Sequence, residues 1–429
     1  MTPRAYVTVG LAFGDEGKGA TVDYLARLHG ALLVVRYSGG PQAGHNVVLE
    51  DGRRHRFSQF GSASFLPGVR THLSRHMLVE PYAMANEAEV FNRTMGEGDV
   101  MERTSVDPLC PVITPYHWML NRLREEARGE ARHGSCGMGV GELRAMQATP
   151  VRTLEVCHLG DYRRTAGILA DIKECVVEQA RGINRLSPYC LGIEGEDVHK
   201  LAEFYKYFIR RIRLAENSDA IETMRNCVTV FEGAQGVLLD EDFGFVPHNT
   251  WTKTTAANAN VMIRDAGIPS TTVGVVRTYF TRHGPGPFVS ECEPSIEDRH
   301  NGTAAWQGRF RTGLFDLAAL RYSLRYAGGV DEIALTCIDQ VGPFFEYVDA
   351  YRMPDGRIIK NVGELGTPCP ASDLDGAAPI VEKKRVGGNS TPDIFQELIG
   401  LSVSHVSWGE TATQRMSRIH DFRQAVLHR

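Results

Sequence analysis

The chain of 429 residues is longer than a typical domain of about 100–200 residues, so one elaborated domain or two domains would fit. A net charge of −5 provides no basic surface for nucleic acid, which makes small-molecule chemistry the better expectation. Nine cysteines without a CxxC pair and fifteen histidines without an HExxH spacing predict reduced thiols and no zinc site, whereas Mg²⁺ held by oxygen ligands stays possible.

The N-terminus leads directly into strand-like residues, with no basic and then apolar signal segment. No apolar run approaches the roughly 20 residues that are needed to span a bilayer. We therefore expect a cytoplasmic protein.

A buried first strand is predicted at Tyr6–Gly10, and GDEGKG follows it before a helix that begins near Lys18. Such a turn is typical of a phosphate-binding loop, because glycines let backbone N–H groups converge on an anion and the lysine adds positive charge. It departs from GxxxxGK[ST], since Ala12 replaces the first glycine and Gly19 replaces the hydroxyl that would bind Mg²⁺. Asp15 is the candidate replacement ligand. A plain strand-to-helix turn is the alternative.

A second buried strand is predicted at Ala31–Arg36, and the polar loop SGGPQAGHN follows it. The glycines of this loop permit a tight path that could present Gln42 and His45 to the same anion. A lone histidine is usually structural, so the functional interpretation of His45 depends on its pairing with the first loop.

The middle of the chain is predicted to be mostly helical, because apolar residues recur every three or four positions. The expected helices are Met84–Met95, Trp118–Gly129, Arg163–Arg181, Asp197–Glu216 and Asp219–Asn226. Between the second and third of them, the glycine-rich stretch His133–Gly141 is expected to be either a flexible connector or a loop that suits a phosphate.

The strand predicted at Cys227–Glu232 runs into GAQG, which places Gln235 at its carboxyl end. In an open α/β sheet, ligands bind outside the carboxyl ends of the strands. Gln235 is therefore expected to share a crevice with Asp15 and His45.

A further strand at Thr271–Tyr279 ends in the turn TRHGPGPF, and an exposed loop with GRFRTG follows before a helix at Leu314–Ala327. Arg309 and Arg311 lie two residues apart in that loop. Arginine suits bidentate capture of a carboxylate or a phosphate, although two surface arginines without a ligand are an equally good interpretation.

The strand predicted at Glu332–Asp339 ends in an acid, which could accept two parallel N–H bonds from a guanine edge or simply cap a helix. A hairpin is expected at Tyr347–Ile359, a long surface loop at Gly363–Gly388, a last strand at Ser402–Gly409 and a final helix at Glu410–His428. With no repeat or clear linker, the pattern predicts an α/β fold. We expect a single large domain over residues 1–429, with a central, mostly parallel sheet flanked by helices and a P-loop-like nucleotide site.

Taken together, these motifs resemble those of the adenylosuccinate synthetase family, and the similarity covers nearly the whole chain. The matching pieces, in order, are GDEGKG, RYSGGPQAGHN, GSCGMGVG, FEGAQGVLLD, TRHGPGPF, GRFRTGLFD, CID, AYRMPDG and SWGET. The resemblance implies a ligase, usually a homodimer, that uses GTP and Mg²⁺ to condense L-aspartate with IMP. The products would be adenylosuccinate, GDP and phosphate. Phosphorylation of the purine 6-oxygen converts a poor leaving group into a good one.

The resemblance implies roles for the residues that match. Asp15 would be the general base at N1 and a Mg²⁺ ligand, with the Gly44 carbonyl as a second metal ligand. His45 would be the general acid, Lys18 would neutralise phosphate oxygens, and Gln235 would hold the 6-phosphoryl group.

The implied binding sites are larger sets of residues. The GTP site would comprise Gly14, Asp15, Glu16, Gly17, Lys18, Gly19, Gly44, His45, Asn46, Asp339, Ser407 and Gly409. The site of the acceptor nucleotide would comprise Gln42, Ser135, Cys136, Gln235, Thr250 and Arg309. Arg309 and Arg311 would bind the amino acid.

Several substrate contacts depart from the family pattern. Gln42 stands where asparagine is usual, Cys136 where threonine is usual and Cys337 where lysine is usual, and Trp306 and Gln307 replace paired threonines. One arginine is missing from the amino acid loop. The arginine that crosses the dimer to the acceptor phosphate has no aligned counterpart, and its nearest candidates are Arg144 and Arg152.

Three alternatives follow from these departures. The acceptor could be another purine nucleotide such as dGMP or GMP, although phage relatives of that kind typically lose the aspartate that Asp15 retains. The donor could be another amine, or ATP could replace GTP. A nucleotide-binding regulator without catalysis is disfavoured, because Asp15, Lys18, His45 and Gln235 are all intact.

Overall fold

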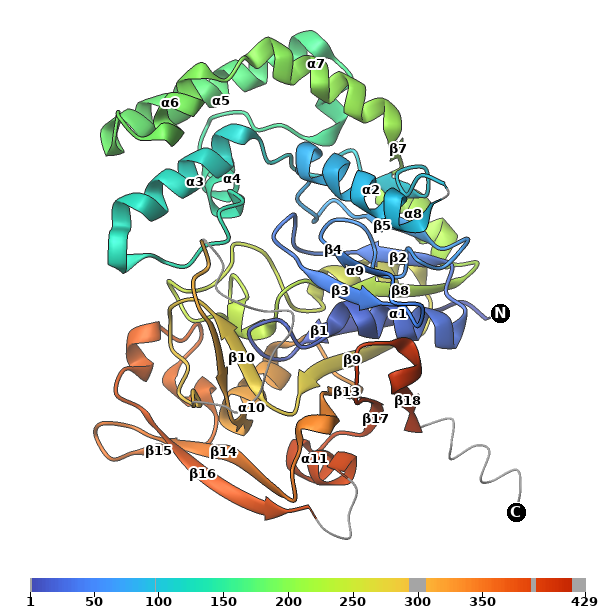
Figure 1. Cartoon of the computed structure of the whole chain (residues 1–429), viewed down its shortest axis with the longest axis vertical. Helices are drawn as coiled ribbons and strands as arrows, with labels where there is room; N and C mark the ends of the chain where they lie inside the picture. Colours follow the sequence, from blue (N-terminus) through green and yellow to red (C-terminus); the bar gives the residue numbers. More distant parts are fainter. Residues whose placement is uncertain (1, 97, 293–305, 387–390, 419–429) are drawn as a thin grey trace.

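The computed structural model describes residues 2–96, 98–292, 306–386 and 391–418. A ten-stranded sheet crosses the molecule (Figure 1), and its neighbouring strands are parallel except for the last pair at one edge. In spatial order its strands are β18 (Arg415–Ser417), β17 (Val403–Ser407), β13 (Glu332–Thr336), β9 (Ser270–Arg277), β1 (Arg4–Gly10), β8 (Val228–Glu232), β2 (Leu33–Arg36), β5 (Arg70–Leu73), β6 (Thr104–Val106) and β7 (Arg213–Leu214). The predicted α/β fold with a mostly parallel sheet is confirmed.

The central strands are apolar along their length because both faces of a parallel sheet are covered. Every residue of β2 and β8 is buried. The helices are α1 (Lys18–His29), α2 (Pro81–Met95), α3 (Pro115–Arg128), α4 (Val140–Gln147), α5 (Tyr162–Ile183), α6 (Pro188–Gly195), α7 (Val198–Phe208), α8 (Asn217–Met224), α9 (Ala257–Ala266), α10 (Leu317–Tyr326) and α11 (Thr391–Ile399). In Figure 1, α3, α5, α6 and α7 gather at one end of the molecule, where α3 packs on both α5 and α6. Within the described ranges, every helix is too short or too polar to cross a bilayer.

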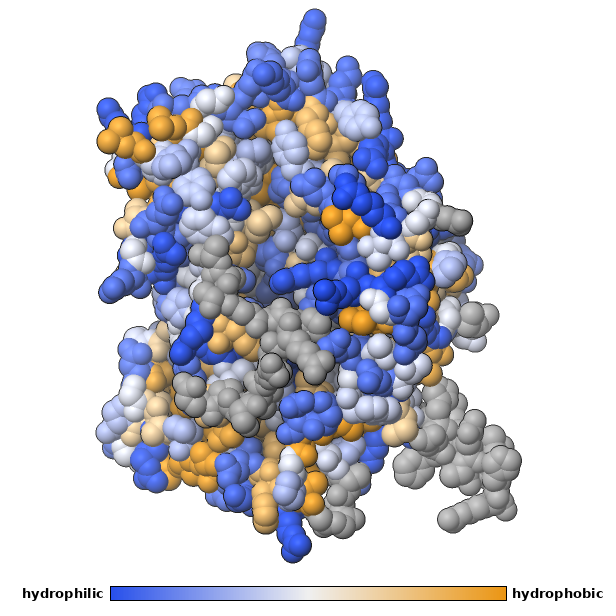
Figure 2. All heavy atoms as spheres, in the orientation of Figure 1, coloured by the Kyte–Doolittle hydropathy of each residue, from blue (hydrophilic) through white to orange (hydrophobic). Residues whose placement is uncertain are grey.

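Smaller sheets complete the fold. β3 (His45–Val48) pairs with β4 (Arg54–Phe57), and β10 (Phe280–His283) pairs with β11 (Phe310–Gly313). At the end of the molecule opposite the helical layer, β14 (Phe344–Arg352) pairs with β12 (Phe315–Asp316), β15 (Ile358–Ile359) and β16 (Ala378–Arg385). Figure 2 shows apolar side chains gathered at this end, where Phe344, Ile358 and Val381 are exposed.

Four sequence predictions were wrong because a distant strand supplies hydrogen bonds that local pattern does not reveal. GRFRTG is not an exposed loop, since β11 pairs with β10. The expected loop Gly363–Gly388 contains β16, which pairs with β14. The helix expected at Asp197–Glu216 ends at Phe208, and β7 follows it. The final helix Glu410–His428 is wrong as far as Ser417, because β18 pairs with β17 there; residues 419–428 lie outside the described residues.

Other boundaries shift for local reasons. The strand predicted at Glu332–Asp339 ends at Thr336, because Cys337 has a left-handed φ of 60°. The helix predicted at Leu314–Ala327 begins at Leu317, after the side chain of Asp316 accepts a hydrogen bond from a first-turn N–H. The other predicted helices and strands and the β14–β15 hairpin are confirmed to within about three residues. The elements that were not predicted are α4, α6, α9, α11, β3, β4, β5, β6, β10 and β12.

Candidate active site

The loop after β1 is built around a buried carboxylate. Glu16 Oε1 accepts hydrogen bonds from the backbone N–H groups of Ala12 (3.0 Å) and Gly14 (2.8 Å), and the other oxygen forms an ion pair with Lys18. The side chains of Glu16 and Lys18 are each only 2% exposed. Gly17, with a φ of 92°, caps α1. Glu16 therefore shapes the loop and holds Lys18 at the start of the helix.

Three glycine-rich loops pack directly against one another at the carboxyl edge of the sheet. A Cβ on Gly10 would lie 2.6 Å from the backbone oxygen of Gln235, and a Cβ on Gly39 would lie 2.5 Å from Cβ of Ala234. A Cβ on Gly19 would lie 2.5 Å from Cβ of His45. The structure thus brings Gln235 and the second loop against the first loop, as the strand order requires.

His45 begins β3 and is held by a buried carboxylate. Its Nδ1 lies 2.5 Å from Glu232 Oε1, and Glu232 also accepts hydrogen bonds from the backbone N–H (2.8 Å) and the hydroxyl (2.5 Å) of Ser62. Burial lowers the pKa of His45 and outweighs the attraction of Glu232. Burial raises the pKa of Glu232, but Arg36, His45 and Ser62 together bring it below the ordinary value. The pair is therefore a carboxylate with a neutral imidazole, whose Nδ1–H donates to Glu232 and whose Nε2 is left for a ligand.

Asp15 adopts a left-handed conformation, with a φ of 62°, and faces an imidazole that lies far along the chain. His283 Nε2 is 3.2 Å from Asp15 Oδ2. Burial raises the pKa of Asp15, but the hydrogen bond and charge of His283 and the charges of Arg277 and Lys18 outweigh it and hold the pKa at about 2. Asp15 is consequently ionised at neutral pH.

The predicted metal ligands provide only hard oxygen atoms. The Asp15 carboxylate and the Gly44 carbonyl lie on adjacent loops, and Mg²⁺ prefers such donors. A Cβ on Gly44 would collide with the Arg56 guanidinium, so this backbone passes beneath a positive side chain. The residues present fit an oxygen-ligated Mg²⁺.

Two glutamine side chains have buried polar atoms without a hydrogen-bond partner in the described part of the chain. These atoms are Oε1 and Nε2 of Gln42 and Oε1 of Gln235. Buried polar atoms are nearly always hydrogen-bonded. The unmatched amides therefore indicate a polar ligand beside these loops.

The predicted guanine site lies on the neighbouring strands β13 and β17. The hydroxyl of Thr336 donates to the backbone oxygen of Glu16 (2.8 Å), which links the end of β13 to the first loop. Asp339 is exposed in a short 3₁₀ helix after β13, and Ser407 ends β17, which pairs with β13 in the sheet. Gly409 lies under the amide of Gln414.

The glycine-rich loop between α3 and α4 packs against the turn after β10. A Cβ on Gly134 would collide with Pro285, and one on Gly137 would lie 2.8 Å from the ring of Trp306. Ser135 donates a hydrogen bond to Asn121 (3.0 Å). Burial raises the pKa of Cys136 to about 11, so this residue is a neutral thiol.

The remaining candidates for contact with the acceptor nucleotide, Thr250, Arg144 and Arg152, lie in two different places. Thr250 donates its backbone N–H to Leu239 (2.8 Å), and the next residue, Trp251, lies 3.3 Å from a Cβ placed on Gly141 at the start of α4. Arg144 is on α4, beside this segment, and its Nε is buried without a partner in the described chain. Arg152 is exposed and pairs with Asp171 on α5 (2.7 Å). Arg144 therefore has a buried donor without a partner in the described chain, whereas Arg152 forms an exposed ion pair.

Arg309, directly before β11, and Arg311, on β11, are both already paired. Arg311 Nε lies 3.0 Å from Glu291 Oε1, and Nη1 donates to the backbone oxygens of Gly284 (3.0 Å) and Gly286 (2.9 Å). Arg309 Nη2 lies 3.1 Å from the same carboxylate and is 69% exposed. The hydrogen bond from Arg311 holds the pKa of Glu291 below its ordinary value.

Sequence reasoning missed the carboxylate and imidazole partners Glu232, Glu291 and His283. Glu232 and His283 stand inside the motifs FEGAQG and TRHGPGPF. An acid at the end of β8, directly before Gln235, was a signal that could have identified Glu232. No local pattern reveals the pairing of His283 with Asp15, because β10 reaches the first loop only through the tertiary fold.

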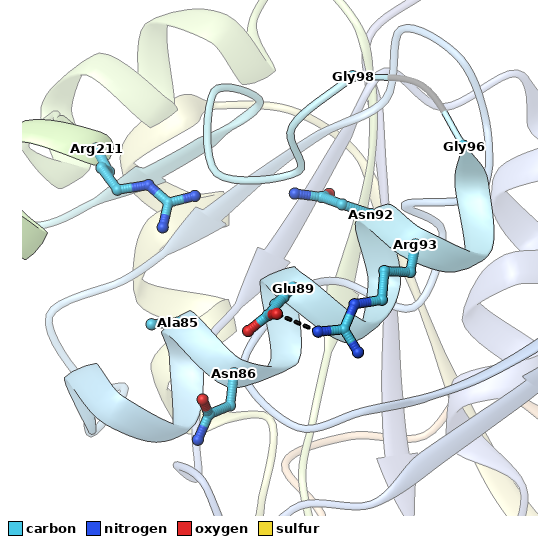
Figure 3. A pocket seen from close by; sticks show the side chains of 8 residues that line it. All are labelled: Ala85, Asn86, Glu89, Asn92, Arg93, Gly96, Gly98 and Arg211. Atoms are coloured by element: carbon cyan, nitrogen blue, oxygen red, sulfur yellow. Dashed lines mark hydrogen bonds and ion pairs between the residues drawn. The ribbon is translucent and has the colours of Figure 1, made fainter.

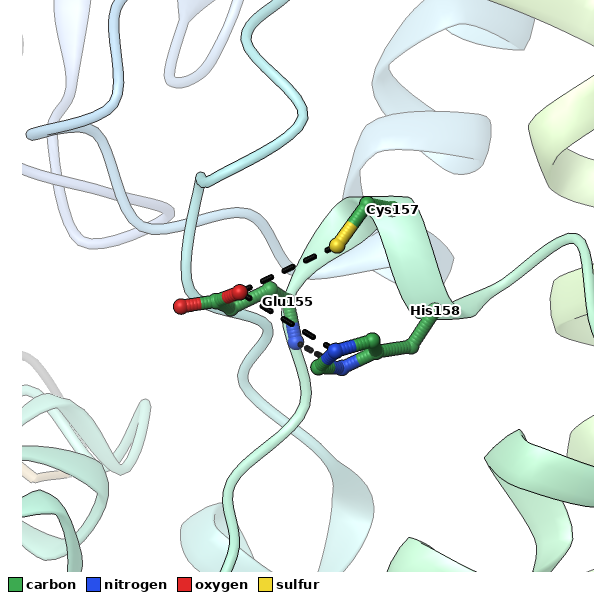
Figure 4. Close-up of side chains that lie close together, drawn as sticks. All are labelled: Glu155, Cys157 and His158. Carbon is green, nitrogen blue, oxygen red and sulfur yellow. Dashed lines mark hydrogen bonds and ion pairs between the residues drawn. The ribbon is translucent and has the colours of Figure 1, made fainter.

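Two other groups lie away from this edge. A surface hollow beside α2 (Figure 3) contains Glu89 and Arg93, which pair with one another, and Arg211, which pairs with Asp99. Figure 4 shows Glu155, Cys157 and His158 close together. The backbone N–H of Glu155 donates to His158 Nδ1 (3.1 Å), so Nε2 carries the imidazole proton and has no lone pair for a metal.

The sheet, the loops at its carboxyl edge and the unmatched amides define an α/β protein with a candidate site for a polar ligand at that edge. A family model described as adenylosuccinate synthetase matches residues 7–384, and the chain belongs to this family. Its members are ligases of purine biosynthesis that form a C–N bond between aspartate and a purine nucleotide and bind GTP and magnesium.

The relatives span nearly the whole chain. The adenylosuccinate synthetase of Vibrio parahaemolyticus is 29% identical over 97% of this chain and 98% of its own, and that of Symbiobacterium thermophilum is 30% identical over 88% and 86%. The fold is similar to the fully ligated adenylosuccinate synthetase from Plasmodium falciparum (TM-score 0.81, 18% identity, 96% of this chain and 99% of that one). It is also similar to the succinoaminodeoxyadenylate synthetase of cyanophage S-2L, bound to dGMP and to dATP as an energy donor (TM-score 0.58, 17% identity, 97% and 96%).

Proposed function

We propose that the protein uses GTP to condense L-aspartate with the 6-oxo position of IMP, giving adenylosuccinate through a 6-phosphoryl intermediate. The observation that carries this proposal is the convergence of ionised Asp15, carboxylate-bound His45 and the unmatched amides of Gln42 and Gln235 on one edge of the sheet. This arrangement supplies a base, an imidazole and amide groups for a phosphoryl oxygen.

In the first step Asp15 removes the N1 proton, and the electrons of the N1–H bond move into the ring so that the 6-oxygen attacks the γ-phosphorus of GTP. The bond between the γ-phosphorus and the bridging oxygen breaks with its electrons on the departing GDP. A carboxylate with a pKa of about 2 is a weak base, so this proton transfer is coupled to the attack rather than completed before it. Nε2 of His45, Lys18 and the glutamine amides face the transferred phosphoryl group. Negative charge there would favour protonation of Nε2, which Glu232 would stabilise from the other side of the ring.

In the second step the neutral aspartate amine attacks C6, and the C6–O bond breaks with its electrons on the departing phosphate, which also takes up the proton that the amine loses. Arg309 and Arg311 would bind the carboxylates of the amino acid, which requires Glu291 to share or release them. Mg²⁺ bound by Asp15 and the Gly44 carbonyl would supply neutralisation of phosphate charge.

A second candidate is the same chemistry on dGMP or GMP, or with ATP as phosphoryl donor. It is favoured by Trp306, Gln307, Cys136 and Cys337, which replace the residue types that the family usually places around its substrates. The cyanophage relative, bound to dGMP and dATP, shows that this fold accepts both changes in another protein. We further propose a single-domain, cytoplasmic homodimer, as the family resemblance implies.

The experiment that tests the proposal is turnover of IMP, GMP and dGMP, each with GTP or ATP, Mg²⁺ and L-aspartate, with phosphate release and product mass as readouts. We expect the highest kcat/KM with IMP and GTP. Preference for dGMP or GMP, or for ATP, would establish the second candidate. A folded protein that releases no phosphate with any acceptor would overturn both.

A further inference from the structure

We propose that His283 is a positioning residue for Asp15, orienting its carboxylate for the phosphoryl-transfer step. This inference deepens the proposed function and rests on it. His283 ends β10, about 270 positions beyond Asp15 in the chain, yet its Nε2 lies 3.2 Å from Asp15 Oδ2.

The surroundings of the imidazole fix its direction. His283 pairs across the ladder with Phe310 of β11, and the two rings are 5.0 Å apart between centroids. The imidazole is only 18% exposed, and its Nδ1 is buried with no hydrogen-bond partner in the described chain. Among the described residues, the carboxylate of Asp15 is therefore the polar partner that orients the imidazole of His283.

Asp15 needs such a partner because its backbone alone leaves the carboxylate free to rotate. The residue has a left-handed φ of 62° between two glycine-rich segments, and its side chain is 26% exposed. An imidazole that donates its Nε2–H to Oδ2 is sufficient to hold that oxygen. The other oxygen, Oδ1, is then directed to the reacting nucleotide, and a small rotation about χ1 would misplace it.

A structural role in packing β10 against β11 is the competing explanation, and a second pair in the same protein offers a matched control. His405 Nε2 lies 3.1 Å from Glu332 Oε1, and the ring of His405 contacts that of Tyr24 (6.0 Å between centroids). Glu332 begins β13, so this pair lies toward the amino ends of the strands, away from the loops.

The test compares the wild type with His283→Leu, His283→Gln and His405→Leu. Glutamine places an N–H donor where Nε2 stands, whereas leucine keeps volume without a donor. For His283→Leu we expect kcat to fall at least about 10-fold while KM for both nucleotides changes less than about 3-fold. His283→Gln should recover kcat to within about 3-fold of wild type, and His405→Leu should lower Tm and leave kcat unchanged.

Crystal structures of the His283 variants provide a readout that does not depend on turnover. The Asp15 carboxylate should change its direction in His283→Leu and keep it in His283→Gln. The inference is overturned if His283→Leu retains kcat and the Asp15 direction, or if His283→Gln loses as much activity as His283→Leu. If the wild type turns over no acceptor, the proposed function fails, and the Asp15 direction alone decides whether His283 positions it.

Discussion

Two regions of the molecule are organised in opposite ways. One is the phosphate edge, by which we mean the loops after β1, β2 and β8 that are proposed to bind phosphate, and the other is the region around Arg309 and Arg311 that is expected to bind the amino acid. At the phosphate edge, polar side chains are buried in fixed pairs, with Lys18 held by Glu16 and His45 by Glu232. In the region expected to bind the amino acid, Arg309, directly before β11, is 69% exposed and shares the single carboxylate of Glu291 with Arg311 on β11.

The two regions differ in whether their side chains are already positioned before a substrate binds. Buried groups pay their desolvation during folding and are already in place when the nucleotide arrives. Arg309 is exposed and Arg311 is only 14% exposed, and both must give up Glu291 before they bind a substrate. An exposed pair such as Arg309 with Glu291 is worth little on its own. We therefore expect changes at the phosphate edge to act on kcat and changes on β11 to act on KM.

The largest effect is expected for Asp15→Ala and His45→Ala. Each removes a group that faces the reacting atoms, so kcat should fall by roughly 10²-fold or more. Steady-state kinetics with saturating substrates provide the measurement, and circular dichroism checks that the variants fold. Near-normal turnover in either variant would contradict the proposed role.

A second effect is expected for Glu232→Gln, which removes the charge that holds His45 and faces buried Arg36 (3.9 Å). Breaking one partner of a buried ion pair should lower the free energy of unfolding by about 3 kcal/mol. Because the Nε2 of His45 would also lose its electrostatic support, kcat should fall roughly 10-fold. Denaturant unfolding and kinetics measure the two effects; unchanged stability would show that the pair is not a fixed element of the fold.

A third effect concerns Arg311→Gln on β11. Loss of the guanidinium should raise KM for aspartate by about 10-fold, while kcat changes less than about 3-fold. Arg181→Gln, which breaks an exposed pair with Glu194 at 2.6 Å, is the matched control and should leave both constants unchanged. A fall in kcat with constant KM would place Arg311 in the chemistry and remove the distinction between the two regions.

The last effect, on stability and not on turnover, is expected for Glu80→Gln, behind the second loop. Burial raises the pKa of Glu80 to about 7, above the ordinary value of 4.5. Below pH 4.5 the group is protonated in both the folded and the unfolded state and costs no stability. As pH rises from 4.5 through 7, ionisation first favours the unfolded state, so the free energy of unfolding falls. Glu80→Gln should therefore stabilise the protein by about 2 kcal/mol at pH 8 and change it little at pH 4.5. Unfolding at the two pH values measures this, and equal effects at both would contradict it.

Whether a strand could be predicted from the sequence depended on whether its own residues, or only a distant partner strand, identify it. β1, β2 and β8 were predicted because a strand covered on both faces must be apolar throughout. β11, β16 and β18 were not, because each is half-exposed or short and is stabilised by a partner strand that local pattern does not identify.

The candidate site divides in the same way. The amino-acid sequence by itself determined the phosphate loops, since glycine spacing and the adjacent lysine and histidine are local features of the chain. It also determined the family through motifs that keep their order over most of its length. Only the tertiary structure decided which groups control those loops, namely Glu16 inside the first loop, Glu232 behind His45 and His283 against Asp15. The physical reason is that a charge is oriented and its pKa set by neighbours within a few ångströms, and folding chooses those neighbours from anywhere along the chain.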